Sequence, residues 1–219
     1  MKAFVLALML AVPSQAAFLS RAQPVSLRIP AAAASAAPAV QSLSLTGGVY
    51  AVNGLKATEL GFGCFKTVVM HPQAPEAVVK VFSDKYGSGV AEKTRELAQL
   101  ALLPPAAVPA VLAHGVTDVG GKPTAFLVQE KVNGLTLDRP TPSKLAEVKS
   151  LFERLAKARV EIADAESAVK LRQNIMVGET RSGGWGAYLV DPDVTKSDKS
   201  DRELRAFYDG LYAKIVSGR

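Results

Sequence analysis

Residues 61–68 of the chain are GFGCFKTV, and residues 77–82 are AVVKVF. The first stretch holds two glycines one residue apart, Gly61 and Gly63, followed by valines that favour a strand. Glycine at such a position either makes a turn or lets the backbone approach a ligand closely, because it has no Cβ. The second stretch is an apolar strand pattern with one charged residue, Lys80. Together they predict antiparallel strands around a glycine turn, followed by a strand with a lysine inside it.

Short apolar runs extend this pattern over the N-terminal half. They predict strand material at 43–52 and 56–60 that leads into the glycine turn, a second strand at 67–70, a third at 77–82, and two more at 108–116 and 124–132. Between the runs at 77–82 and 108–116, apolar residues recur at helical spacing. They predict a helix over 90–103, which Pro104 and Pro105 end. We therefore expect about five antiparallel strands, with one helix inserted after the third.

Helical and strand patterns alternate in the C-terminal half. An apolar stripe predicts a helix over 143–159, and runs at 174–177 and 187–190 predict a hairpin. Ser200 and Glu203 have the spacing of a capping box at the start of a last amphipathic helix. The whole pattern is that of an α+β protein.

Lys80 is the one charged residue in this apolar strand. It must find an anion or reach solvent, because burying an unpaired ammonium group costs several kcal/mol.

In this order, the motifs resemble the protein-kinase-like superfamily. GFGCFKTV is similar to the glycine-rich loop G-x-G-x-x-G-x-V, with Lys66 in place of the third glycine, and VVK at 78–80 is similar to the strand that carries the phosphate-binding lysine. Asn174 and the triplet Asp191-Pro192-Asp193 are similar to the metal-binding hairpin of kinases, where the triplet is usually Asp-Phe-Gly. The resemblance covers residues 50–194.

The resemblance implies a kinase-like fold with a nucleotide cleft. Its N-lobe, about 45–132, would be a five-stranded antiparallel sheet with one inserted helix, and its C-lobe, about 133–219, would be reduced and mainly helical. ATP and Mg²⁺ are the implied cofactors. The implied nucleotide-binding residues are Gly61, Phe62, Gly63, Lys80, Glu96, Glu130 and Val132, and the backbone of Glu130 to Val132 would hydrogen-bond the adenine. In the family, the lysine's partner is a glutamate on the inserted helix, and this helix offers Glu92 and Glu96, one turn apart. Glu96 is preferred, because it is more central in the helix and adjoins the apolar Leu97, and Glu92 remains the alternative. The implied metal ligands are Asn174 and Asp191, and the implied catalytic residues are Lys80, Asp164 and Asp191.

Two departures from the family pattern leave the activity open. Val169 stands five residues before Asn174, where kinases place the catalytic aspartate, and it cannot accept a proton. Asp164 could serve only from a longer loop. The 26 residues after Asp193 leave no room for an activation loop, so the chain resembles minimal bacterial effector kinases. We expect an Mg-dependent phosphotransferase acting on protein Ser/Thr. The alternatives are a pseudokinase that binds nucleotide or protein, and an exported α+β binding domain unrelated to kinases.

Composition bounds the other function classes. The chain has 219 residues, 48% hydrophobic and 21% charged, with a net charge of +6. Lys2, Arg21 and Arg28 precede the first acidic residue, Glu59, and without them 23 basic residues face 20 acidic ones, which argues against a nucleic-acid partner. With Cys64 alone, no intramolecular disulfide can form. His71 and His114 are expected in loops or on the surface.

The first 44 residues are expected to lie outside the folded domain. Residues 1–16 have the basic start, apolar run and small-residue exit of a secretory signal peptide, and 17–44 are rich in Ala, Pro and Ser, as in a tether. This predicts a secreted or periplasmic protein, or one delivered into another cell, with no membrane span after cleavage. The protein substrate or partner and the oligomeric state stay open.

Overall fold

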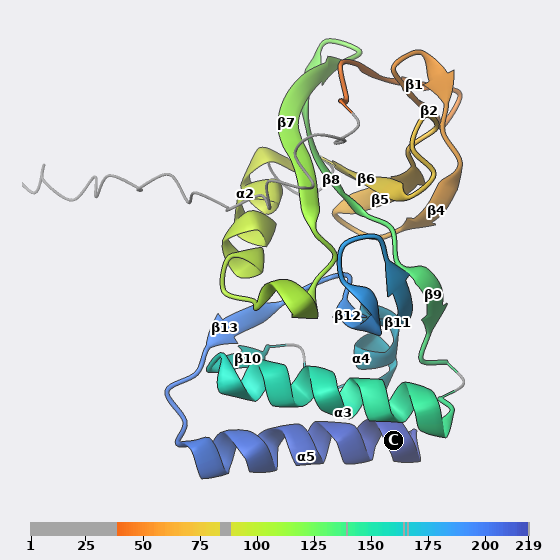
Figure 1. Cartoon of the computed structure of the whole chain (residues 1–219). Helices are drawn as coiled ribbons and strands as arrows, with labels where there is room; N and C mark the ends of the chain where they lie inside the picture. Colours follow the sequence, from red (N-terminus) through yellow and green to blue (C-terminus); the bar gives the residue numbers. More distant parts are fainter. Residues whose placement is uncertain (1–38, 84–88, 139, 164, 166, 219) are drawn as a thin grey trace, which may run out of the picture.

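The structure is a computed structural model that describes residues 39–83, 89–138, 140–163, 165 and 167–218 (Figure 1). The predicted signal peptide and most of the predicted tether, residues 1–38, lie outside the described residues. The first strand begins at Leu43, which is 4% exposed, so the packed part starts slightly before the expected Leu45.

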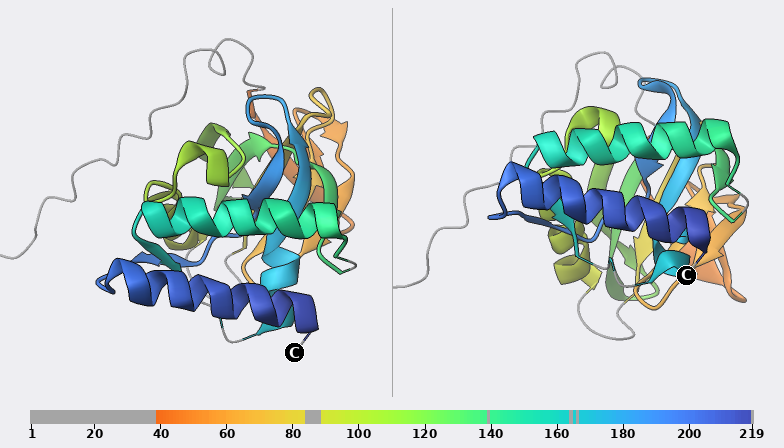
Figure 2. Two further views of the ribbon diagram at one scale, coloured as in Figure 1. Left: turned by 60° about the horizontal axis from the view of Figure 1, so that its bottom comes forward. Right: turned by 90° about the horizontal axis from the view of Figure 1, so that it is seen from below.

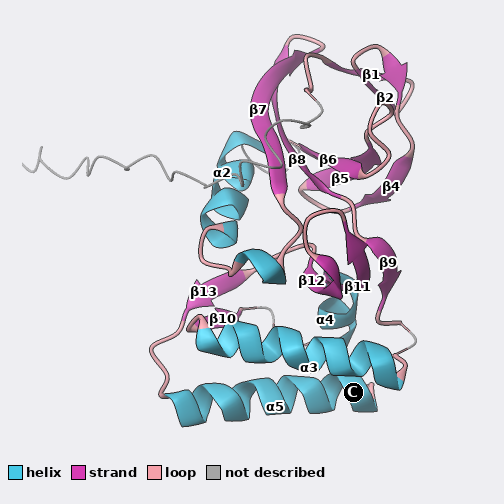
Figure 3. Ribbon diagram, in the orientation of Figure 1, coloured by secondary structure: helices cyan, strands magenta, loops and turns pink. Residues whose placement is uncertain are grey.

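A five-stranded antiparallel sheet forms the upper half of the molecule in Figure 3. Its strands are β4 (Glu59–Phe62), β5 (Lys66–Met70), β6 (Ala77–Phe82), β7 (Val111–Val119) and β8 (Lys122–Glu130). Their order across the sheet is β4-β5-β6-β8-β7. Helix α2 (Gly89–Leu100) and the short 3₁₀ helix η1 (Pro105–Ala107) lie between β6 and β7 in the chain. The predicted α+β class, and a five-stranded sheet with one helix inserted after its third strand, are therefore confirmed.

Strand β6 is apolar almost throughout because both of its faces are covered. Val79 and Val81 pack into a cluster with Leu43 and Val52 on one face. On the other face, Phe82 belongs to a larger cluster that includes Leu100 of α2. Alternation along the strand places Lys80 on this second face, toward α2. The sheet thus points Lys80 at the inserted helix.

The predicted strand at 43–52 is in fact a hairpin. Strands β1 (Leu43–Thr46) and β2 (Val49–Val52) pair around Gly47 and Gly48, and β3 (Leu55–Lys56) joins them in a separate three-stranded sheet. Gly47 and Gly48 have φ of 57° and 80°, a left-handed conformation that favours glycine. The two glycines that make this turn lie within the stretch that the apolar pattern predicted to be one strand.

In its described residues, the second half combines three helices with five short strands. The helices are α3 (Pro142–Lys157), α4 (Ala168–Asn174) and α5 (Asp201–Ser217). The strands are β9 (Asn133–Thr136), β10 (Val160–Ile162), β11 (Ile175–Thr180), β12 (Gly184–Leu189) and β13 (Val194–Lys196). β12, β11 and β9 form one sheet, and β10 pairs with β13. The β11–β12 hairpin was predicted, whereas α4, β9, β10 and β13 were not.

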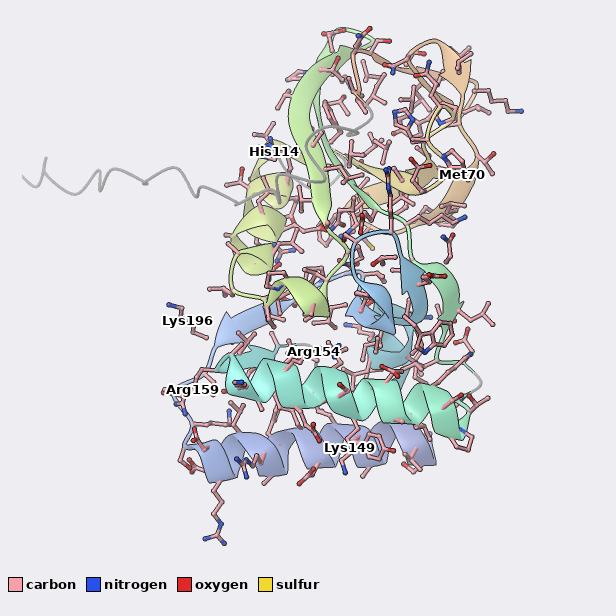
Figure 4. The ribbon with its side chains drawn as sticks, viewed as in Figure 1. Met70, His114, Lys149, Arg154, Arg159 and Lys196 are labelled. Carbon is pink, nitrogen blue, oxygen red and sulfur yellow. The ribbon has the colours of Figure 1, made fainter. Side chains whose placement is uncertain are left out.

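Helices α3 and α5 lie side by side and cover the base of the molecule (Figure 2). The capping box of α5 is as predicted, since the Ser200 hydroxyl accepts from the Glu203 N–H and the Glu203 carboxylate accepts from the Ser200 N–H. Arg154, labelled in Figure 4, ties α3 to β12 by donating to the Ala187 carbonyl at 3.1 Å. Among the described residues, no helix is long and apolar enough to cross a bilayer.

Glycines allow the backbones of β9 and β11 to approach closely. Gly134 of β9 lies opposite Gly178 of β11. A Cβ at Gly134 would lie 2.1 Å from the Val177 carbonyl oxygen, and one at Gly178 would lie 2.6 Å from the Asn133 carbonyl oxygen. Neither backbone group can move without breaking the strand pairing.

Replacing Gly134 by alanine is therefore expected to lower the free energy of unfolding by about 2–3 kcal/mol, the cost of overpacking a rigid site. Urea-induced unfolding measures the change. Gly210→Ala in α5 is the control, because a Cβ there meets nothing within 4 Å. It should stabilise the protein by about 0.5–1 kcal/mol, since glycine is unfavourable inside a helix. Equal stabilities of the two variants would contradict the close approach.

Candidate functional site

A cleft of about 760 Å³ lies between the glycine turn, helix α2 and the segment that follows β12. Residues from both halves of the chain line it: Leu60, Gly61, Phe62, Gly63, Cys64, Phe65, Lys66, Val68, Phe82, Glu92, Arg95, Glu96, Gln99, Gln173, Asn174, Asp191, Pro192 and Asp193. The cleft therefore brings together most of the motifs that the sequence singled out.

Beneath the cleft, Lys80 of β6 is paired with Glu96 of α2. Both residues are 4% exposed. The Lys80 ammonium donates to Glu96 Oε1 and, at 2.7 Å, to the Val190 carbonyl. Burial, together with the nearby Lys66, lowers the pKa of Lys80, although Glu96 acts in the opposite sense. Of the two glutamates considered, the structure places Glu96 against Lys80, while Glu92 pairs with Arg95 instead.

A second lysine, which the sequence did not mark as a site residue, completes the cluster. Lys66 Nζ of β5 lies 2.6 Å from Glu96 Oε2 and 2.6 Å from Asp191 Oδ1. Its side chain is 14% exposed and lines the cleft. Burial opposes its charge, but the two carboxylates outweigh this effect and raise the pKa of Lys66.

The Glu96 carboxylate, which both lysines share, stays ionised because of these opposite charges. Burial of Glu96 favours its neutral form, yet Lys80 and Lys66 together lower its pKa below the usual value. Two ammonium groups and two carboxylates, those of Glu96 and Asp191, thus form one balanced cluster. Asp191 is its exposed end, with half of its side-chain surface accessible.

The segments that carry Asn174 and Asp191 are tied together at the wall of the cleft. Asn174 ends α4, and its carbonyl accepts from the Val190 N–H at 2.9 Å. Asp193 is held from the other side, because its Oδ1 accepts from Gln99 Nε2 of α2 at 2.8 Å. The predicted Asn and Asp therefore lie in one cleft with the glycine turn and Glu96.

The two glycines of the turn are not required by the packing of the protein. Neither Gly61 nor Gly63 is in the left-handed region. A Cβ at Gly61 would meet nothing within 4 Å, and one at Gly63 only the Lys66 carbonyl oxygen at 3.9 Å. The Gly63 N–H closes the turn by donating to that carbonyl at 2.8 Å. The turn thus presents open space to the cleft, where a ligand could approach the backbone, and Phe62 is 83% exposed beside it.

The predicted adenine-binding segment does not line the cleft. The Glu130 N–H donates to the Ala110 carbonyl and the Lys131 N–H to the Glu76 carbonyl, at 2.9 and 2.7 Å, so neither is free for a base. The Glu130 side chain is buried and accepts from the Ser182 hydroxyl at 2.6 Å. Val132 is also buried. Glu130 therefore fastens the β11–β12 turn to the end of β8.

The other residues considered in the sequence do not line the cleft or are outside the described residues. Asp164 is outside the described residues. Val169 lies on α4, 61% exposed, and does not line the cleft. His114 is exposed on β7, the opposite edge of the sheet from β4 (Figure 4). His71 is in a loop, as expected, but it is only 1% exposed, and burial lowers its pKa.

No protein-family model matches the chain, and no curated protein matches it either. The function is therefore argued from the geometry of the cleft.

Proposed function

We propose that the protein is a kinase-like phosphotransferase that binds ATP in this cleft and acts on protein serine or threonine. The observation that carries the proposal is the buried pair of Lys80 and Glu96, joined through Lys66 to Asp191. A lysine on the third strand of the sheet, paired with a glutamate on the inserted helix, is the arrangement that protein kinases use to hold nucleotide phosphates. The Lys80–Glu96 pair lies under a cleft lined by Gly61 and Gly63, which also supports a kinase-like function.

Phosphoryl transfer depends mainly on positioning and on neutralising negative charge. Lys66 is the ammonium group that reaches the cleft surface, and Lys80 lies below it. Glu96 fixes both lysines, because each of its oxygens accepts from one of them. A phosphate chain entering beside the glycine turn would meet a cation whose position is already set.

Magnesium is also implied by the resemblance, but the described residues do not fit it as they stand. Asp191 Oδ1 is occupied by Lys66, and Asp193 Oδ1 by Gln99. Within the described part of the chain, no group of three or more His, Cys, Asp or Glu side chains could hold a metal ion. Mg²⁺ usually binds through one or two carboxylates plus substrate phosphates, so a free Asp191 would be the minimum requirement.

A second candidate function is a nucleotide-binding module that transfers no phosphate. Two observations favour it: Val169 is exposed on α4 and does not line the cleft, and Lys66 occupies the carboxylate that a metal would need. Such a protein would bind ATP and signal through a partner. Asp164 stays a prediction for the catalytic base.

The test uses the full chain with radiolabelled ATP, with binding measured by calorimetry and transfer measured to the protein itself and to a generic Ser/Thr substrate. We expect the wild-type protein to bind ATP and to transfer phosphate, and we expect Lys80→Met to lose the transfer. This variant should fold, because Glu96 keeps Lys66 as a partner. Lys56→Met, at an exposed lysine of β3, is the control. Binding without transfer would establish the second candidate, and no binding at all would overturn both.

A further inference from the structure

We infer that Lys66, and not Lys80, is the residue that contacts the phosphate groups, and that Lys80 is a positioning residue that acts through Glu96. The inference rests on the proposed function and deepens it, because it names the cation that recognises the ligand. It departs from the resemblance to kinases, which implies Lys80 for that contact.

The first step is access to the cleft. Lys66 lines the cleft, and its side chain is 14% exposed. Lys80 is not among the residues that line the cleft, and it is only 4% exposed. Its ammonium group is held by Glu96 and by the Val190 carbonyl. A ligand in the cleft can therefore contact Lys66 without any rearrangement, whereas contact with Lys80 would require one.

The second step is the place of Lys66 beside the glycine turn. The turn closes on Lys66 itself, since the Lys66 carbonyl accepts from the Gly63 N–H at 2.8 Å. Gly61 and Lys66 both line the cleft, and a Cβ at Gly61 would meet nothing within 4 Å. An approachable backbone and an ammonium group thus face one space, and together they suit a phosphate group.

The third step is how firmly the ammonium group is placed. Lys66 Nζ lies 2.6 Å from Glu96 Oε2, 2.6 Å from Asp191 Oδ1 and 5.8 Å from the centroid of the Phe82 ring. Within the described part of the chain, the two carboxylates use two of its three N–H donors. A phosphate oxygen can accept from the third in a charge-assisted hydrogen bond. Neither carboxylate has to give up the lysine when the ligand binds.

Lys80 has a different task, which is to fix Glu96. Each oxygen of Glu96 accepts from one lysine, Oε1 from Lys80 and Oε2 from Lys66. Glu96 is 4% exposed, so an oxygen that lost its lysine would be left buried without that partner. Removing Lys80 would let the carboxylate shift, and Lys66 would shift with it. A displaced cation slows phosphoryl transfer more than it weakens binding, since a misplacement of about 1 Å can cost about 100-fold in rate.

The test compares Lys66→Met with Lys80→Met in the full chain, by ATP calorimetry and by the rate of transfer at saturating ATP. The two variants are matched, because each leaves Glu96 with one lysine. Lys66→Met should weaken ATP binding by about 10–100-fold, as expected for the loss of a hydrogen bond between charged groups. Lys80→Met should keep the ATP affinity within about threefold of wild type and slow the transfer by about 100-fold.

Arg95→Met is the control for charge. It removes a positive charge from the same cleft, but Arg95 is paired with Glu92 and is 59% exposed. This variant should change the ATP affinity by less than about threefold. Urea-induced unfolding of all three variants shows that the affinities are those of folded proteins.

If Lys66→Met binds ATP as tightly as Lys80→Met does, the inference is overturned, while the proposed nucleotide site stands as long as the wild type binds ATP. If the wild type binds ATP but transfers no phosphate, the difference between the two affinities decides alone. If the wild type does not bind ATP, the proposed function falls, and the inference falls with it.

Discussion

Replacing Glu96 by alanine is expected to lower the free energy of unfolding by about 3–5 kcal/mol at neutral pH, because removing one partner leaves a buried charge uncompensated. Among the partners that the described residues provide, Lys80 would keep the Val190 carbonyl and Lys66 would keep the half-exposed Asp191. Nucleotide binding should be lost as well, since both lysines would be free to leave their positions. Urea-induced unfolding and ATP calorimetry measure the two effects.

The deficit of Glu96→Ala should shrink as the pH rises. Burial already lowers the pKa of Lys80, and losing Glu96 removes the largest interaction that raises it. Between this lowered pKa and the ordinary pKa of lysine, about 10.4, the unfolded chain binds more protons than the folded one, so stability increases with pH. Unfolding at pH 7 and pH 9.5 should therefore show a smaller difference from wild type at the higher pH.

Glu92→Ala is the control for this prediction. Glu92 lies one turn away on the same helix, and its partner Arg95 is 59% exposed. Exposed ion pairs of this kind contribute about 0.5 kcal/mol or less. If the two variants lost similar stability, the buried pair would not be the centre of the site.

The pairing of Lys80 with Glu96 was predicted from the resemblance to kinases, which places the partner of this lysine on the inserted helix. The apolar strand required only that Lys80 find an anion or solvent, and the predicted helix offered two glutamates. The capping box of α5, in contrast, was predicted from local sequence, since its residues are three apart. Elements of three or four residues, such as β10 and β13, were not predicted, because so short a run shows no periodicity.

The place of Lys66 could not be predicted without strand register. In the β5–β6 pairing, Val68 lies opposite Lys80 and Lys66 lies opposite Phe82, which puts both lysines on one face. The motif alignment instead treated Lys66 as a substituted glycine. Given this β5–β6 register, the alternation of side chains along the strands places Lys66 beside Lys80.

The prediction that the backbone at 130–132 binds adenine depended on information of a different kind. Whether a backbone N–H is free depends on which carbonyls approach it, and the carbonyls of Ala110 and Glu76 come from distant segments. No residue type in the stretch encodes those contacts. Glu130 itself gave no signal of its contact with Ser182, since a buried glutamate and an exposed one look alike in sequence.

Replacing Gly61 by valine is expected to weaken ATP binding by about 100-fold while leaving the fold intact. The side chain would fill the open space at the mouth of the cleft and keep phosphate oxygens from the backbone, at a cost of about 2.7 kcal/mol of binding. Gly61 lies on β4 opposite Val68, and a Cβ there meets nothing within 4 Å. Valine also favours strands, so stability should be unchanged or rise by about 0.5 kcal/mol.

A reciprocal control separates the two roles that glycine can have. Gly121, in the β7–β8 turn, has φ of 82°, so Gly121→Val should cost about 1–3 kcal/mol of stability through backbone strain and leave ATP affinity unchanged. Calorimetry and urea-induced unfolding on both variants give four values, and the proposal requires opposite patterns. If Gly61→Val instead lost stability and kept its affinity for ATP, the glycines would be making a turn and nothing more, and the cleft would lose its role in nucleotide binding.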